Sequence, residues 1–183
     1  MTRLTIFILL LLGLGYFVYQ QGLIAKFQEY ITLKHMIRLS SSAFIDNGLI
    51  PSVYTCDGMA VNPPLEIADV PGNAQSLALI VEDPDAPGMT FTHWVIYNIP
   101  ANTTTIPEKG VPVNALQGAS STGEAQYVAP CPPSGTHRYI FTLYALDATL
   151  SLPDSVSKTE VLDAMKNHIV DKTTLMGRYA KHQ

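Results

Sequence analysis

Five side chains that can bind anions or transfer protons lie where strands of this chain are expected to end. Asp83 and Asp85 are two residues apart in an extended Asp-Pro-Asp segment, which lets both carboxylates face one side. His93, His137 and Tyr139 complete the group. Aspartate and histidine together can act as general base and acid, or as a two-histidine, two-carboxylate metal site. Alternatively, the aspartates are turn formers and the histidines are boundary residues with satisfied hydrogen bonds.

Two segments that are apolar at both odd and even positions must position the first three of these groups. Residues 77–81 and 93–99 have this pattern, which is typical of a central strand covered on both faces. Between them, EDPDAPGMTF contains two prolines and a glycine, so the strand should stop there and a loop should begin. A charged loop at the end of two core strands is a favoured place for chemistry.

Residues 137–147, HRYIFTLYALD, predict the clearest strand of the chain. Side chains alternate between the two faces of a strand, so His137, Tyr139, Phe141 and Leu143 should share one face. The histidine and the tyrosine are therefore expected to point the same way.

The rest of the chain favours an all-β sandwich or barrel with one packing helix. Short strands are expected within 43–55 and 61–70, and 101–133 is a long loop rich in Thr, Gly, Ser and Pro, of a kind that often binds ligands. Ser157 and Glu160 form a capping box that opens a helix. Its apolar stripe is expected to comprise Val161, Leu162, Met165 and Ile169.

Two features near the C-terminus have less specific patterns. His168 lies on the expected helix with no partner four residues away, which favours a surface histidine over a metal ligand. The closing segment 176–180, MGRYA, fits either a last strand or a helical tail.

Composition argues for one domain and against nucleic acid as a partner. The chain has 183 residues, a net charge of -4, and 11 Lys and Arg scattered without a run. A nucleic-acid-binding domain usually carries a basic patch, and none is present in this sequence. No Walker, HExxH, G-x-S-x-G or dinucleotide motif occurs, and we expect no cofactor.

The N-terminal segment suggests a membrane anchor. Residues 4–25 carry no charge and match the thickness of a bilayer core as a helix, so 1–25 are expected to form a transmembrane anchor or signal segment. Residues 26–42 are expected to be an amphipathic linker, and 43–183 the folded domain. The charge count after the span favours a cytoplasmic domain, whereas the three-residue head resembles an export signal. We expect a membrane-anchored protein with its domain on the extracytoplasmic side.

Cys56 and Cys131 are the chain's two cysteines, each in a turn that contains proline or glycine. In an exported domain they would form one structural disulfide, and in a cytoplasmic domain two buried thiols. The absence of a CxxC pattern argues against a metal site.

Four segments carry a family resemblance: DPDAP, HWVIYNIP, PCPPSGTHRY and FTLYALD. They resemble the phosphatidylethanolamine-binding protein family, also called the Raf kinase inhibitor protein family, in its bacterial branch. The resemblance runs from about Phe44 to Tyr179 and includes YTCDG, NPPL and GRY. The forty N-terminal residues lie outside the region of resemblance.

The resemblance implies an antiparallel β-sandwich with a C-terminal helix and a small anion pocket. It implies that the pocket is lined by Asp83, Asp85, His93, His137 and Tyr139. Family members bind phosphate-bearing head groups there, and some inhibit kinases or proteases. The sequence departs from the bacterial members in two places. The segment SSTG stands where their sequence usually reads NDFG. Ala129 stands where they have a glycine, and alanine gives the backbone less conformational freedom at the expected lip of the pocket.

We therefore predict a non-enzymatic binding protein whose pocket takes phosphate-bearing ligands such as phosphoethanolamine. Tyrosine and histidine would donate hydrogen bonds to phosphate oxygens, and the aspartates would accept the other imidazole N–H or receive an ammonium group. A hydrolase or metal-dependent enzyme is one alternative. An envelope protein that binds a partner protein and keeps a vestigial pocket is another.

Overall fold

The computed structural model describes residues 16–26 and 36–181. Residues from Met36 onward form one compact unit, and the helical residues 16–26 belong to a separate one. The elements of the larger unit are β1 (Arg38–Ser40), β2 (Gly48–Leu49), the 3-10 turn η1 (Ser52–Tyr54), β3 (Leu65–Ala68), β4 (Ser76–Asp83), β5 (Phe91–Pro100), β6 (Thr105–Ile106), β7 (Leu116–Gly118), β8 (Thr136–Leu146), α2 (Lys158–Met165) and β9 (Ile169–Ala180).

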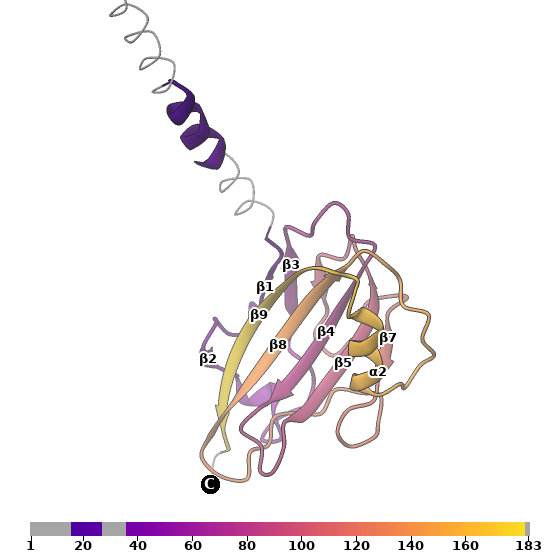
Figure 1. Ribbon diagram of the computed structural model, residues 1–183. Helices are drawn as coiled ribbons and strands as arrows, with labels where there is room; N and C mark the ends of the chain where they lie inside the picture. Colours follow the sequence, from indigo (N-terminus) through magenta and orange to yellow (C-terminus); the bar gives the residue numbers. More distant parts are fainter. Residues whose placement is uncertain (1–15, 27–35, 182–183) are drawn as a thin grey trace, which may run out of the picture. The chain divides into compact units, whose positions relative to one another are not determined.

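The larger unit is mainly β, as predicted, with two sheets. One has three strands in the order β1-β3-β6, and the other has six in the order β2-β9-β8-β4-β5-β7. Neighbouring strands are antiparallel except for β2 and β9, which are parallel. Figure 1 shows β9, β8, β4 and β5 running side by side, with α2 against one face near β5.

Buried side chains form two clusters, one on each face of the six-stranded sheet. The larger cluster joins the two sheets and includes Leu39, Ile67, Leu79, Trp94 and Phe141. The smaller cluster lies under α2 and includes Ile80, Val95, Tyr97, Val161 and Met165. Because β4 and β5 contribute to both clusters, they are central strands with two covered faces, which confirms the prediction from their two-sided apolar pattern.

The alternation predicted for β8 is confirmed. His137, Tyr139, Phe141 and Leu143 are buried on the face toward the larger cluster, while the residues between them are exposed or half-buried. The capping box is also confirmed, since the Ser157 hydroxyl accepts the Glu160 N–H and the Glu160 carboxylate accepts the Ser157 N–H.

The helix is shorter than the sequence predicted. α2 ends at Met165, and Ile169, expected on its apolar stripe, opens β9 opposite Leu146 instead. The segment from Ile169 is rich in β-branched residues, which favour a strand. The closing MGRYA lies in β9, and the expected long loop at 101–133 contains the short strands β6 and β7.

The expectation of a membrane anchor over residues 4–25 is corrected. Residues 1–15, which carry much of that segment, lie outside the described part of the chain. In the described ranges 16–26 and 36–181, no helix combines the length and apolar character needed to cross a bilayer. The expected transmembrane helix, membrane-anchored state and extracytoplasmic location are therefore not supported.

The expected linker 26–42 is only partly described, because residues 27–35 lie outside the described ranges. Its described end is part of the folded unit. Arg38–Ser40 form β1, which pairs with β3, and Ile37 and Leu39 are buried in the larger cluster.

Candidate functional site

The end of β4 meets the beginning of β8 at one edge of the sandwich. The two strands are adjacent and antiparallel, with Glu82 opposite Ile140. Asp83, the last residue of β4, follows the alternation of Val81 and faces the larger cluster, as His137 does. The His137 Nδ1 lies 2.7 Å from the Asp83 Oδ2, and both side chains are almost fully buried.

His93 joins this pair because of an irregularity in β5. Trp94 pairs with Val81 and Thr92 pairs with Glu82, so His93 is an extra residue in the ladder. Simple alternation with Val95 and Tyr97 would place His93 on the α2 side of the sheet. The extra residue is a β-bulge, which turns the side chain away from the face that alternation predicts. The His93 imidazole therefore lies edge-on to the Tyr139 ring, with 5.1 Å between the ring centroids.

The His93 imidazole is held by the backbone of the loop that follows β7. Its Nδ1 donates to the Val128 carbonyl at 2.6 Å, and the Val128 N–H donates back to the His93 carbonyl at 2.9 Å. A carbonyl oxygen can only accept, so the proton sits on Nδ1. Burial lowers the pKa of His93, and the Val128 bond and the Asp83 charge offset this in part. The neutral ring presents Nε2 as a hydrogen-bond acceptor.

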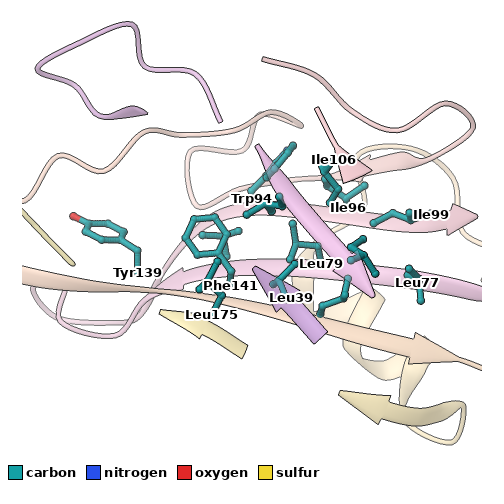
Figure 2. Packing of buried hydrophobic residues seen from close by; sticks show 14 of the residues in the cluster. Leu39, Leu77, Leu79, Trp94, Ile96, Ile99, Ile106, Tyr139, Phe141 and Leu175 are labelled. Carbon is teal, nitrogen blue, oxygen red and sulfur yellow. The ribbon is translucent and has the colours of Figure 1, made fainter. Parts of the chain in front are cut away.

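Tyr139 carries an unsatisfied polar group. Its residue is 1% exposed, and within the described ranges its hydroxyl has no hydrogen-bond partner. Figure 2 shows the ring at one end of the core side chains with the hydroxyl pointing away from them. Burial raises the pKa of Tyr139, so the hydroxyl stays protonated and can donate. A buried polar group without a partner costs free energy unless something else satisfies it, such as a ligand.

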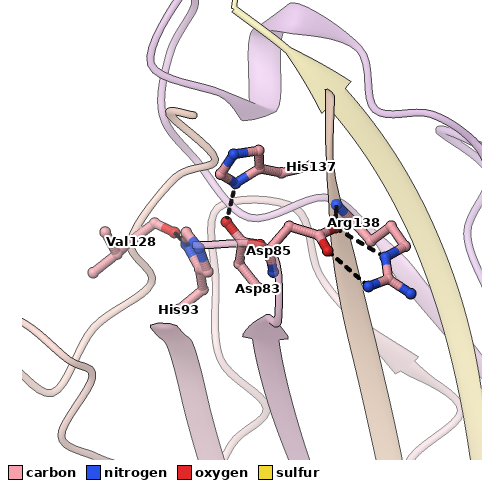
Figure 3. Close-up of polar contacts among 6 residues, drawn as sticks. All are labelled: Asp83, Asp85, His93, Val128, His137 and Arg138. Atoms are coloured by element: carbon pink, nitrogen blue, oxygen red, sulfur yellow. Dashed lines mark hydrogen bonds and ion pairs between the residues drawn. The ribbon is translucent and has the colours of Figure 1, made fainter. Parts of the chain in front are cut away.

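Asp85, the fifth residue of the expected group, turns away from the others (Figure 3). Its carboxylate accepts hydrogen bonds from the Arg138 backbone N–H, Nε and Nη2 at 2.9, 2.9 and 2.7 Å. The Arg138 guanidinium lowers the pKa of Asp85 to about 2. Asp85 still contacts the Asp83–His137 pair through its backbone, since the Asp85 N–H donates to the Asp83 Oδ1.

A cavity of about 190 Å³ lies against Asp83, His93 and His137. Sequence reasoning identified these three polar lining residues but missed most of the apolar wall. The wall consists of Ala86, Pro87, Phe91, Val128, Ala129, Cys131, Pro132 and Pro133. The Phe91 ring packs on His93 with centroids 4.7 Å apart. In the sequence, only the position of Phe91 directly after the charged loop indicates that it could line the cavity.

One side of the wall is fastened by a disulfide. Cys56 and Cys131 are bonded, with their Cα atoms 5.4 Å apart and a sequence separation of 75. The Cys56 N–H also donates to the Pro130 carbonyl at 3.1 Å. The segment from Val128 to Pro133 is therefore attached to β5 at one end and to the turn after η1 at the other.

Hydrogen-bonding groups lie at the cavity and next to it. The Tyr139 hydroxyl is a donor, although Tyr139 is not among the residues that line the cavity. Each imidazole at the cavity has its Nδ1 engaged and its Nε2 without a protein partner in the described part of the chain. Among the same residues, no group of three or more His, Cys, Asp or Glu side chains is placed to hold a metal ion.

The chain is similar to proteins of one family over nearly all of the larger unit. The family model described as phosphatidylethanolamine-binding protein matches residues 40–180. A UPF0098 protein of Methanothermobacter thermautotrophicus is 49% identical over 150 residues, covering 79% of this chain and 99% of the relative. A UPF0098 protein of Chlamydia pneumoniae is 44% identical over 151 residues, covering 79% of this chain and 99% of the relative.

Two solved structures have a similar fold. A phosphatidylethanolamine-binding protein homolog of Chlamydia trachomatis matches with a TM-score of 0.78 and 42% identity, covering 81% of this chain and 99% of that one. YbcL of E. coli matches with a TM-score of 0.74 and 27% identity, covering 80% of this chain and 99% of that one.

Proposed function

Because this chain belongs to the phosphatidylethanolamine-binding protein family, we propose that it is a non-enzymatic binding protein whose cavity holds a phosphate-bearing ligand. The residues that take the phosphate are His93, His137 and Tyr139, and Asp83 orients His137. The observation that carries this proposal is the buried Tyr139 hydroxyl, which lacks a protein partner within the described ranges and belongs to a ring that packs edge-on against His93.

The chemistry of the two imidazoles suits a phosphate monoester. Phosphate oxygens accept hydrogen bonds, so the Tyr139 O–H and the Nε2–H of a protonated His137 can donate to them. Asp83 accepts from His137 Nδ1, which fixes the ring orientation and leaves Nε2 for the ligand. His93 is held neutral by burial, so its Nε2 can accept from the P–OH of a singly protonated phosphate.

Calorimetric titration of the full chain with inorganic phosphate and with phosphoethanolamine tests the proposal. We expect His137→Ala to weaken binding by at least ~1.5 kcal/mol, as for the loss of a charge-assisted hydrogen bond. Tyr139→Phe should also weaken binding while leaving the free energy of unfolding unchanged or higher, because it deletes only a hydroxyl that has no partner.

His168→Ala is the matched control. His168 is exposed and pairs with Asp147 at 2.8 Å, outside the cavity. Its removal should leave phosphate affinity unchanged. Failure of the wild-type chain to bind either ligand, or full affinity in both cavity variants, would refute the proposal.

A further inference from the structure

The carboxylates near the cavity are already committed to protein donors. Asp83, the carboxylate in the lining, accepts His137 Nδ1 on Oδ2 and the Asp85 N–H on Oδ1, and its side chain is 5% exposed. Asp85 is occupied on both oxygens by Arg138. A ligand ammonium group would therefore meet no unpaired carboxylate among the described lining residues.

The remainder of the wall is apolar. Phe91, Pro87, Val128 and Pro132 present carbon surface to the cavity, and none of these side chains has a hydrogen-bonding group. Such surface favours an uncharged group that leaves water on binding. The polar atoms of the lining side chains belong to Asp83, His93 and His137, while the apolar groups come from the loop after β4, the start of β5 and the segment 128–133.

The cavity size narrows the ligand further. Its volume of about 190 Å³ is below the roughly 300–1,000 Å³ of sites for drug-sized ligands. A phosphate with one attached ring or short chain suits this volume better than a larger molecule.

We propose that the cavity selects a phosphate monoester whose ester group is uncharged and apolar, an aryl phosphate above all, over one that carries an ammonium group. This inference rests on the proposed function. The phosphate lies against His93 and His137, next to Tyr139, and the aryl ring lies against Phe91 and the prolines of the wall. The arrangement sorts ligands by the group attached to the phosphate.

A cation over the Phe91 ring is the competing arrangement. Aromatic faces attract ammonium groups, and binding sites for such groups usually surround them with several rings. Here the rings lining the cavity are Phe91 and the two imidazoles, and Phe91 is already packed against His93. A protonated imidazole would repel a cation. The apolar contact is therefore the stronger of the two.

Competition among inorganic phosphate, phosphoethanolamine and phenyl phosphate, measured by calorimetry at one pH with the full chain, tests the inference. We expect phenyl phosphate to bind about tenfold more tightly than phosphoethanolamine, as for burial of a few carbon atoms. Phe91→Ala should remove most of this preference, measured as the ratio of the affinities for phenyl phosphate and phosphoethanolamine, so that a change in phosphate contact common to both ligands cancels. Phe91→Leu, which keeps an apolar side chain, should retain part of it.

Val113→Ala serves as the control, because Val113 is an exposed apolar residue that does not line the cavity. Phosphoethanolamine binding as tightly as phenyl phosphate, or a preference that survives in Phe91→Ala, would overturn the inference and leave the proposed function intact. Failure of all three ligands to bind would instead refute the proposed function.

Discussion

The His137 Nδ1 and the Asp83 Oδ2 lie 2.7 Å apart, although the two residues are separated by 54 positions in the chain. They meet because β4 and β8 are neighbours and Asp83 ends one strand where His137 begins the other. The contact fixes which imidazole nitrogen carries the proton and leaves Nε2 for a ligand. Ligand binding should therefore depend on this pair.

Phosphate affinity should fall as pH rises from about 5 to 7, because burial places the pKa of His93 below its ordinary value of 6.5. Protonation turns an imidazole Nε2 from an acceptor into a donor to phosphate oxygens, so the charged form binds better. Asp83→Asn removes a negative charge that raises the pKa of His93, and should move the midpoint to lower pH. Calorimetry across this pH range measures both effects.

Inorganic sulfate provides the control for protonation of the ligand itself, because sulfate does not titrate in this range. The same downward trend with sulfate assigns the effect to the protein. A flat profile for both anions would contradict the assignment of the imidazoles as ligands.

Acid should destabilise the fold through His93. Burial places the pKa of His93 in the folded state below its ordinary value of 6.5, so the folded state resists protonation more than the unfolded chain does. The free energy of unfolding should therefore be constant well above pH 6.5 and decrease as pH falls below it. His93→Gln should reduce this decrease. Urea unfolding at pH 7.5 and pH 5.5 would detect the difference, and equal slopes in both proteins would contradict it.

The Asp85 carboxyl should titrate near pH 2 in the folded protein, and Arg138→Ala should return its pKa toward 3.8. A lowered carboxyl pKa stabilises the fold above the unfolded value and loses that contribution as pH falls from 3.8 toward 2. NMR of the side-chain carboxyl carbon follows the titration directly. Arg178→Ala is the matched control, since Arg178 lies opposite Arg138 in the sheet. An unchanged Asp85 pKa in Arg138→Ala would refute the pairing.

Removal of the disulfide should lower both stability and affinity. The bond closes a loop of 75 residues, for which the chain-entropy model gives about 4.5 kcal/mol. The double variant Cys56→Ser, Cys131→Ser should therefore unfold at a lower denaturant concentration. Phosphate affinity should also weaken, because Cys131 forms part of the cavity wall.

Both cysteines are exposed, so a thiol reductant should reproduce this loss in the wild-type chain and have no effect on the double variant. Equal stability and equal affinity with and without the bond would show that the wall is held by other contacts.

Several parts of the fold follow from local patterns. Two-sided apolar runs identified β4 and β5 as central strands, and strict alternation in β8 placed His137 and Tyr139 on one face. The spacing of Ser157 and Glu160 located the start of α2. Each of these patterns reflects a local period or a local hydrogen bond, so neighbouring residues suffice to specify it.

Other features depend on partners that are distant in sequence. His93 faces the cavity because two residues of β5 lie opposite one residue of β4. The Asp85 side chain points elsewhere because it binds Arg138 of β8. The end of α2 was mispredicted because Ile169 has a strand partner, Leu146, which outweighs a helical stripe.

The sequence by itself determined the strand faces, the family and the polar side chains to consider for a site. The tertiary structure alone decided which of them meet: it joined Asp83 to His137, aimed His93 through a bulge, and paired Asp85 with Arg138. The physical reason is that a strand's period is a property of its own backbone, whereas register, bulges and ion pairs depend on two segments at once.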